Sequence, residues 1–199
     1  MERGEILGSV GACGAGMTTL LQIMGTLERP DAGSVVYGAD RVDTLSPSRV
    51  ARFRNQRIGF VFQFHQLLPE FSLLENVAMP AMIGGRSKKE AMAEASRLIG
   101  YLGLADRADH RPAQLSGGEC QRGAVARALI NRPDVVLADE PSGSLDSHNR
   151  AELHRLIADL RRDMGQTFVI VTHDEHLASN CDRVVRMADG RITDIISNQ

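Results

Sequence analysis

Short apolar runs alternate along this chain with longer segments of helical periodicity. The first strand-like run spans residues 5–10 and is followed by a helix-like segment at 17–27. Further strand-like runs occur at 58–62, 134–138 and 167–171. Apolar strands separated by helices are typical of a parallel sheet with both faces covered. We therefore expect an α/β fold.

The middle of the chain, from about 73 to 130, is largely helical in pattern. We expect it to form a helical subdomain inserted into a single domain of residues 1–199. Near the other end, about 183–195, two strand-like runs flank Asp189 and Gly190. Because an Asp-Gly pair suits a tight turn with a left-handed backbone, this segment predicts a hairpin.

Composition narrows the class of protein. A net charge of −2 gives no electrostatic argument for binding nucleic acid or an anionic lipid surface. No apolar run approaches the roughly 20 residues needed to span a bilayer, and no signal-like segment opens the chain. We expect a cytosolic chain that contacts membranes only through partners. The widely spaced Cys13, Cys120 and Cys181 predict free thiols rather than a disulfide or zinc site.

A segment with the spacing of a phosphate-binding loop lies between the first strand and the first helix. Its glycines allow backbone N–H groups to wrap a phosphate, and the Thr18 hydroxyl can bind Mg²⁺. Met17 stands where lysine belongs, and a thioether offers neither charge nor hydrogen-bond donors. Taken alone, the segment fits a plain structural turn equally well. The candidate residues are Gly11, Ala12, Cys13, Gly14, Ala15, Gly16, Met17, Thr18 and Thr19.

Two further segments carry candidate chemistry. An apolar run ends in Asp139 and Glu140, which would place a magnesium-organising aspartate beside a water-activating glutamate at the carboxyl edge of the sheet. A solvated loop is the alternative for two acids after a strand. Earlier, Ser116 is suited to cap a helix, while Gly117 and Gly118 leave backbone amides open to an anion. A simple cap would explain the serine but not the two glycines.

Residues 115–122, LSGGECQR, closely resemble the signature motif of ATP-binding cassette (ABC) proteins. Other segments follow in the order of that family. Gln63 resembles the lid-loop glutamine, Asp146 the end of the D-loop, and His173 the switch histidine. The resemblance covers nearly the whole chain. It implies a P-loop NTPase of the ABC type, with a mainly parallel sheet and an inserted α-helical subdomain.

The segment 62–80 is similar to the LolD family, the ATPase subunits of lipoprotein-releasing transporters. This likeness implies an ATPase that powers lipoprotein release as a peripheral protein at the cytoplasmic face of the inner membrane. Two cassettes would pair head to tail beneath two membrane-spanning subunits, which the lid loop would face. Related exporter and cell-division complexes are an alternative. For four apolar side chains of this segment, the sequence does not decide between a place in the core and a place at a subunit interface: Phe64, Leu67, Leu68 and Phe71.

The same resemblance implies a role for each motif. The phosphate loop would face ATP, with Gln63 and Asp139 completing the Mg²⁺ shell together with the loop hydroxyl. Glu140 would be the general base for the attacking water, His173 would contact the γ-phosphate, and Gln63 would also act in catalysis. The signature and D-loop residues would complete the nucleotide site across the dimer: Ser116, Gly117, Gly118 and Asp146.

The chain departs from the family pattern at Met17, at Cys13, where serine is usual, and at Gly123, where an apolar residue is expected. It also begins just before the phosphate-loop strand, so we expect truncated N-terminal antiparallel strands and no aromatic to stack on adenine. A second hypothesis is therefore a cassette impaired in nucleotide binding, with a structural or regulatory role. The near-neutral charge disfavours a cassette that works on DNA or ribosomes.

Overall fold

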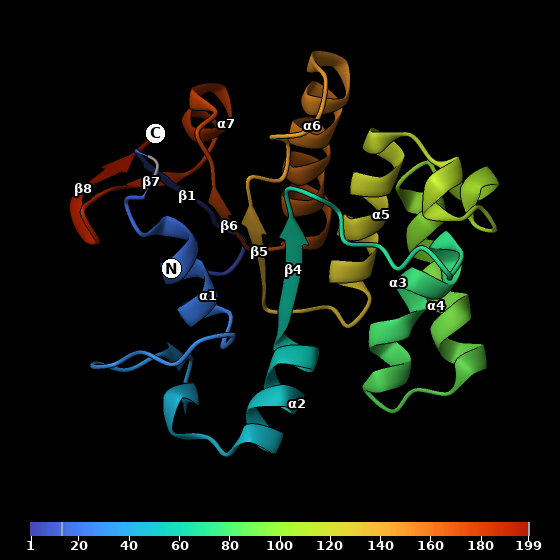
Figure 1. Ribbon diagram of the computed structural model, residues 1–199, viewed down its shortest axis with the longest axis horizontal. Coiled ribbons are helices and arrows are strands. Elements are labelled where there is room, and N and C mark those ends of the chain that lie inside the picture. The colour runs from blue at the N-terminus through green and yellow to red at the C-terminus, as the bar shows by residue number, and fades with distance from the viewer. Residues whose placement is uncertain (13, 199) are drawn as a thin grey trace.

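The computed structural model describes residues 1–12 and 14–198. Its centre is a six-stranded sheet in the order β4-β5-β6-β1-β7-β8 (Figure 1). Neighbouring strands from β4 to β7 pair in parallel, and β8 is antiparallel to β7, which confirms the mainly parallel sheet. The strands are β1 Ile6–Gly11, β4 Ile58–Phe62, β5 Val135–Asp139, β6 Phe168–Val171, β7 Arg183–Ala188 and β8 Arg191–Ser197.

Helices cover both faces of this sheet. Side chains of β5 and β6 alternate between two apolar clusters, because successive residues of a strand point to opposite faces. One cluster includes side chains of α1 Met17–Met24 and α2 Pro47–Arg57. The other includes side chains of α5 Gly117–Leu129, α6 Ser147–Met164 and α7 Glu175–Ser179. The core therefore has two layers, one on each side of the sheet.

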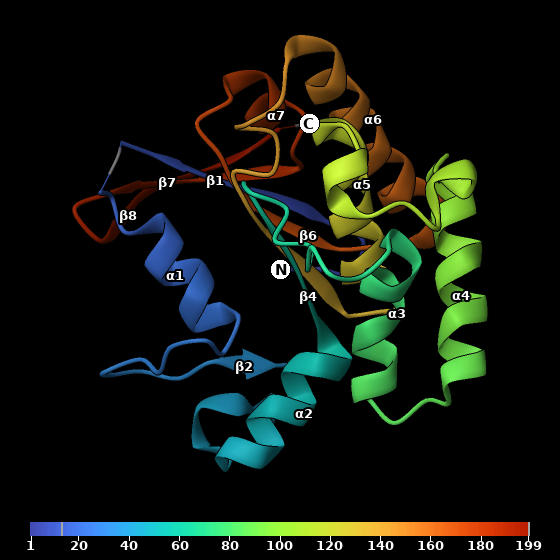
Figure 2. The ribbon, with the colours of Figure 1, turned by 45° about the vertical axis from the view of Figure 1, so that its right-hand side comes forward.

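The helical middle of the chain contains α3 Leu73–Ile83 and α4 Lys88–Tyr101 as well as α5. In both views α3 and α4 lie beside α5, away from β7 and β8 (Figures 1 and 2). Each of the three helices begins with a serine that accepts the N–H of a glutamate three residues later, whose carboxylate accepts the serine N–H. These reciprocal bonds satisfy N–H groups that a helix start leaves unpaired.

The C-terminal hairpin has the predicted turn. Asp189 and Gly190 have φ values of 49° and 72°, the left-handed backbone that a primed turn requires. In contrast, α1 ends at Met24 rather than near residue 27. A Cβ on Gly25 would lie 2.5 Å from the ring of Phe60, so the chain passes this strand too closely for other residues. The next residue then turns out of the helix.

Residues 30–57 hold elements that the periodicity did not predict. A small antiparallel pair, β2 Val36–Tyr37 with β3 Asp40–Arg41, precedes α2. Ser46 and Pro47 at the start of α2 are ordinary N-terminal signals, but Phe53 is its one buried residue among those described, so its apolar pattern is weak. Within residues 1–12 and 14–198 there are also three short 3₁₀ turns: Val42–Thr44, Ala105–Arg107 and Pro112–Gln114.

None of the helices in residues 1–12 and 14–198 has both the length and the apolar character needed to cross a bilayer. Cys120 and Cys181 are buried free thiols, as expected. Burial raises the pKa of the Cys181 thiol to about 12, which disfavours the reactive thiolate form.

Gly123 lies inside α5 where this helix packs against α3. A Cβ here would lie 2.4 Å from Cδ1 of Leu73, so close helix packing accounts for glycine at a position where an apolar residue is usual. We expect Gly123→Val to lower the free energy of unfolding by about 1–3 kcal/mol, because the added methyls overpack this contact. Urea unfolding followed by circular dichroism measures the change.

A glycine in the neighbouring helix gives the matched control. Gly100 lies in α4, and among the described residues a Cβ there would meet no atom within 4 Å apart from its chain neighbours and its own helix backbone. Gly100→Ala should therefore raise the free energy of unfolding by about 0.5–1 kcal/mol through helix propensity alone. Equal stability of Gly123→Val and the wild type would contradict the packing account.

Candidate active site

The carboxyl ends of β1, β4, β5 and β6 meet at one edge of the sheet, because these strands are parallel. The phosphate loop follows β1, and Gln63 follows β4. Asp139 ends β5 and is followed by Glu140, while His173 comes two residues after β6. The fold thus gathers four motifs that are far apart in the sequence.

The phosphate loop is a tight connection between β1 and α1. Gly14 and Gly16 have φ values of 83° and 93°, which other residues adopt only with strain. A Cβ on Gly11 would lie 2.4 Å from the carbonyl oxygen of Met187, so β7 fixes where the loop begins. Ala12, Gly14, Thr18 and Thr19 are exposed and Ala15 is buried. Cys13 lies outside the described residues.

Met17 opens α1 but is only 6% exposed. Its side chain belongs to the apolar cluster between α1 and the sheet, which also contains Leu21 and Val171. A thioether is well suited to such a position because it is flexible and uncharged. The residue at the lysine position therefore adds to the core and brings no positive charge to the loop.

Oxygen donors from separate motifs approach one another beside this loop. The Thr18 hydroxyl lies 3.4 Å from an Asp139 carboxylate oxygen, and burial raises the pKa of that carboxyl. Gln63 places its side-chain amide against Gly143, on the segment that follows Glu140. Residues 1–12 and 14–198 contain no group of three His, Cys, Asp or Glu side chains that could hold a metal. The groups that do approach each other here, the Thr18 hydroxyl and the Asp139 carboxylate, present oxygen atoms, the donor type that Mg²⁺ prefers.

Glu140 has the features of a general base. Its φ of 46° is unusual for a side chain of this size, and its N–H donates to the Val171 carbonyl. Its Oε1 is buried without a hydrogen-bond partner among the described residues, 3.4 Å from Nε2 of His173. Burial raises the pKa of the Glu140 carboxyl, which favours proton acceptance.

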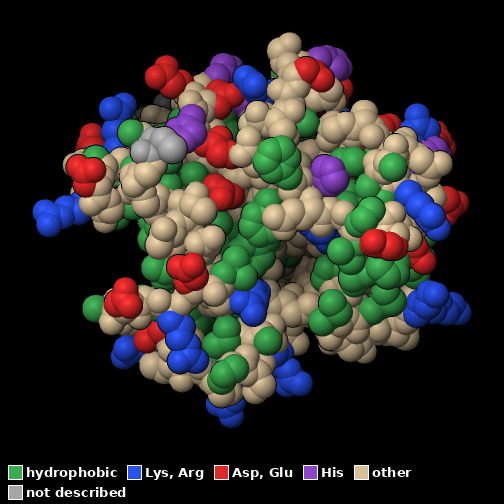
Figure 3. Space-filling view, viewed as in Figure 1, with side chains coloured by type: hydrophobic (Ala, Val, Ile, Leu, Met, Phe, Trp, Pro, Cys, Tyr) green, Lys and Arg blue, Asp and Glu red, His purple; other side chains and the backbone are tan. Residues whose placement is uncertain are grey.

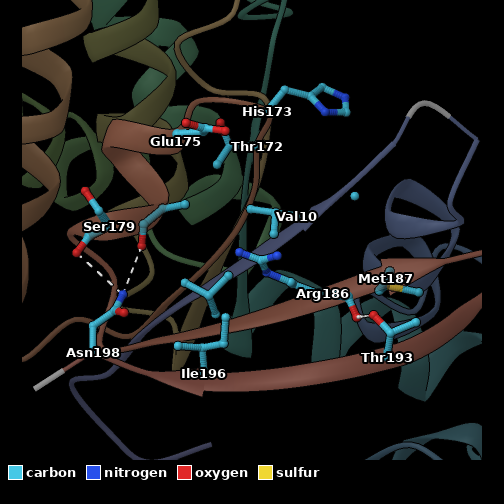
Figure 4. Close-up of a pocket in the computed structure, with 13 residues that line it drawn as sticks. Val10, Thr172, His173, Glu175, Ser179, Arg186, Met187, Thr193, Ile196 and Asn198 are labelled. Carbon is cyan, nitrogen blue, oxygen red and sulfur yellow. Dashed lines mark hydrogen bonds between the residues drawn. The ribbon is translucent and has the colours of Figure 1, made fainter.

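A cavity of about 730 Å³ opens beside His173, between α7 and the β7–β8 hairpin (Figure 4). Gly11 lines it at the phosphate loop, and Arg186 reaches into it from β7. Thr172 lines it next to His173, at the end of β6. The exposed His173 ring therefore faces open space beside the phosphate loop.

The signature and the D-loop contact each other within the chain. Ser116 caps α5, as predicted, and Gly117 is exposed. Gly118 is buried against Asn149, whose Oδ1 would lie 1.9 Å from an added Cβ. Asp146 caps α6, and its carboxylate accepts both the N–H and the side-chain amide of Asn149. Among residues 1–12 and 14–198, no hydrogen bond joins the signature glycines to the phosphate loop.

The lid-loop segment exposes apolar side chains. Phe64 is 70% exposed, and Leu68 and Phe71 are also exposed, whereas Leu67 is buried. Of the four side chains for which the sequence left core and interface open, one therefore lies in the core and three lie at the surface. Arg127 of α5 donates hydrogen bonds to two backbone carbonyls of this loop, those of His65 and Gln66. The signature helix therefore holds the lid loop in place.

Motif reasoning missed two contacts, one with Glu140 and one with Ser142 on the segment that follows it. The Thr172 hydroxyl lies 3.4 Å from Glu140 Oε2, and the Ser142 hydroxyl lies 3.1 Å from a ring nitrogen of His154. Thr172 stands beside the switch histidine in the sequence, but a threonine at a strand end gives no signal of its own. Only the pairing of β5 with β6 reveals the first contact.

Comparison with known proteins adds independent information. The family model described as "ABC transporter" matches residues 1–143. The lipoprotein-releasing system ATP-binding protein LolD of Bacteroides thetaiotaomicron is 60% identical over 192 residues, which cover 96% of this chain and 88% of that relative. The protein of the same description from Porphyromonas gingivalis is 58% identical over 190 residues, covering 96% and 87%.

Solved structures of ATP-binding cassettes are also similar to this chain. A dimeric structure of a bacterial ABC transporter cassette has a TM-score of 0.90 and 35% identity, covering 100% of this chain and 88% of that chain. A dimeric post-hydrolysis state of an ATP-binding cassette, bound to ADP and Pi, has the same TM-score and coverage with 34% identity. With the motifs in cassette order along one sheet edge, the chain belongs to the ABC transporter family of ATP-binding cassette proteins.

Proposed function

We propose that this protein, as a single domain of residues 1–199, is the ATP-hydrolysing subunit of a transporter that releases lipoproteins from the inner membrane. The observation that carries the proposal is Glu140, whose Oε1 has no hydrogen-bond partner among the described residues and lies at the same sheet edge as the phosphate loop. A relative 60% identical over 96% of the chain is described as a lipoprotein-releasing ATP-binding protein. The two relatives compared above favour this cargo over those of related exporters.

Mg²⁺ fits the donor set at this edge. The Thr18 hydroxyl and the Asp139 carboxylate approach within 3.4 Å, and the Gln63 amide follows the neighbouring strand. These are hard oxygen ligands of the kind that Mg²⁺ prefers, and they would hold the ion beside the phosphates. The ion supplies positive charge to the phosphates as their charge redistributes during transfer. Desolvation of Asp139 supports the assignment, because a buried carboxylate is stabilised by a nearby cation.

The reaction we assign is attack of water on the γ-phosphorus of ATP. Backbone N–H groups of the phosphate loop hold the phosphates, and Glu140 Oε1 accepts the proton as the water oxygen bonds to phosphorus. The bond to the leaving ADP oxygen breaks, and His173 contacts the transferred phosphoryl group. Such a transition state is stabilised chiefly by position and charge, so the charge missing at Met17 slows this chain.

A second copy completes the site in this proposal. The Ser116 and Gly117 end of α5 is exposed and has no hydrogen bond to its own phosphate loop among the described residues. A head-to-tail pair would bring this end to the nucleotide of the other copy, where its N–H groups bind phosphate oxygens. Asp146 would accompany it, since Asn149 joins the D-loop to the signature. Both solved relatives described above are dimeric.

We assign the surface around the lid loop as the one that contacts the two membrane-spanning subunits. Phe64, Leu68 and Phe71 are exposed apolar side chains of one short segment, and exposed apolar surface marks protein contacts. Nearby, a cavity of about 380 Å³ lies between α2, β4 and α5 and is lined by Phe62 and Arg127. Figure 3 shows a hollow between the part of the molecule that holds α2 and the part that holds α3 and α4, with apolar side chains around it. The chain would thus reach the cytoplasmic face of the membrane through its partners alone.

Reconstitution tests this function. We expect proteoliposomes that contain this chain and its membrane-spanning subunits to release a fluorescently labelled lipoprotein to a soluble acceptor, in proportion to the ATP hydrolysed. Omitting Mg²⁺, or replacing ATP with a non-hydrolysable analogue, should reduce release to background because the phosphoryl group cannot be transferred. Hydrolysis without release would support a related exporter instead. Release that continues without hydrolysis would contradict the proposal.

A further inference from the structure

Thr172 is a fully buried residue directly after β6, with 0% of its surface exposed. Its backbone N–H donates to the Ser9 carbonyl of β1 at 3.1 Å, so the neighbouring strand fixes its position. His173 follows it at the rim of the cavity described above (Figure 4). A buried hydroxyl at such a place needs partners, because an unpaired one is costly.

Both partners of the Thr172 hydroxyl are identifiable. It accepts the backbone N–H of Asp174 at 3.0 Å and lies 3.4 Å from Oε2 of Glu140. A hydroxyl has a single proton to donate, and a backbone N–H cannot accept one. The proton is therefore directed at the Glu140 carboxylate, which fixes the direction of this hydrogen bond.

The bond distinguishes the two oxygens of Glu140. Oε2 accepts from Thr172, whereas Oε1 has no hydrogen-bond partner among the described residues and lies 3.4 Å from His173 Nε2. We propose that Thr172 is a positioning residue that holds Oε2 so that Oε1 stays available for the attacking water. This inference rests on the proposed ATP hydrolysis. Its physical basis is orientation, because a reaction is fast only when the base is held at the correct angle and distance.

The short helix α7 anchors this arrangement. The Asp174 carboxylate caps α7 by accepting the N–H groups of His176 and Leu177. The backbone of Asp174 is thereby fixed, and its own N–H keeps the Thr172 hydroxyl turned towards Glu140. Without that hydroxyl, the Glu140 side chain is free to rotate and to engage His173 with either oxygen. The chain of contacts therefore runs from the first turn of α7 to the base.

Thr172→Val removes the hydroxyl while nearly keeping the shape of the side chain. We expect it to lower kcat for Mg-ATP hydrolysis by about tenfold and to leave KM within about twofold, because the base is misdirected while nucleotide contacts are unchanged. Thr172→Ser, which keeps the hydroxyl, should retain at least about half of the wild-type kcat. Steady-state phosphate release, measured in the wild-type and Met17→Lys backgrounds, gives both constants.

Thr167 provides a matched control at the other end of β6. It is also buried, and its hydroxyl accepts the N–H of Gly4 at 2.9 Å. Because β5 and β6 pair in parallel from Val136–Phe168 to Asp139–Val171, Thr167 lies at the opposite end of these strands from Glu140. Thr167→Val loses one buried hydrogen bond, so its melting temperature should fall as that of Thr172→Val does while its kcat stays within about twofold of wild type.

The outcomes separate this inference from the function on which it rests. Equal kcat for Thr172→Val and wild type would overturn the positioning role alone, as would equal losses in Thr172→Val and Thr172→Ser. A fall in Thr172→Val matched by Thr167→Val would assign the effect to stability and overturn it too. Absence of hydrolysis by the wild type in both backgrounds would overturn the proposed ATPase and the inference together.

Discussion

Glu140→Gln is expected to lower kcat for ATP hydrolysis by about 10²–10⁴-fold, the largest effect of any substitution proposed for this chain. Glutamine keeps the shape of the side chain but cannot accept the proton of the attacking water. Mg-ATP affinity should stay within about threefold, because Thr18, Asp139 and the phosphate loop are untouched. Phosphate release measures the first quantity, and fluorescence titration with a labelled ATP analogue measures the second.

The same variant should accumulate the nucleotide-bound dimer. If hydrolysis separates two head-to-tail copies, a copy that binds ATP without cleaving it stays paired, and size-exclusion chromatography with Mg-ATP should show a dimer. Glu28→Gln is the matched control, since Glu28 is exposed and follows the C-terminal end of α1, outside every site motif. It should hydrolyse ATP at the wild-type rate. Retention of most of the activity in Glu140→Gln would assign the base to another group.

Much of the fold was predictable because strong local signals agreed with it. The strands β4, β5 and β6 are nearly continuous apolar runs bounded by polar residues, so their limits were correct to within one residue. The hairpin at Asp189 and Gly190 follows from turn chemistry alone. By contrast, α2 exposes most of its surface, so tertiary contact of Phe53 with the sheet side, rather than periodicity, decides its place.

The sequence predicted which residues belong to the candidate site but not how their side chains lie relative to one another. Motif order placed Asp139 and Glu140 after a strand, and parallel pairing of Asp139 with Val171 then put Glu140 beside Thr172. A register shift of one residue would turn these side chains to the other face, and no local pattern reports that register. The burial of Met17 is likewise a tertiary result, because it depends on how α1 lies over the sheet.

Met17→Lys is expected to raise both Mg-ATP affinity and kcat by at least about tenfold. The lysine stem can lie along the same apolar surface as the methionine while its ammonium reaches the loop. There it supplies charge-assisted hydrogen bonds to the outer phosphates, each contributing roughly 1.5–3 kcal/mol, and charge that stabilises the transition state. Isothermal titration calorimetry and phosphate release give the two values.

The ligand-free stability of this variant should move in the opposite direction. Met17 is 6% exposed, so an ammonium introduced there is poorly solvated until phosphates arrive, and the melting temperature without nucleotide should fall. Mg-ATP should then raise it by more than in the wild type, because tighter binding adds more stability at equal ligand concentration. Met17→Leu keeps the apolar volume without charge and should change neither affinity nor kcat appreciably. If Met17→Lys gains no more activity than Met17→Leu, the missing lysine does not limit this cassette.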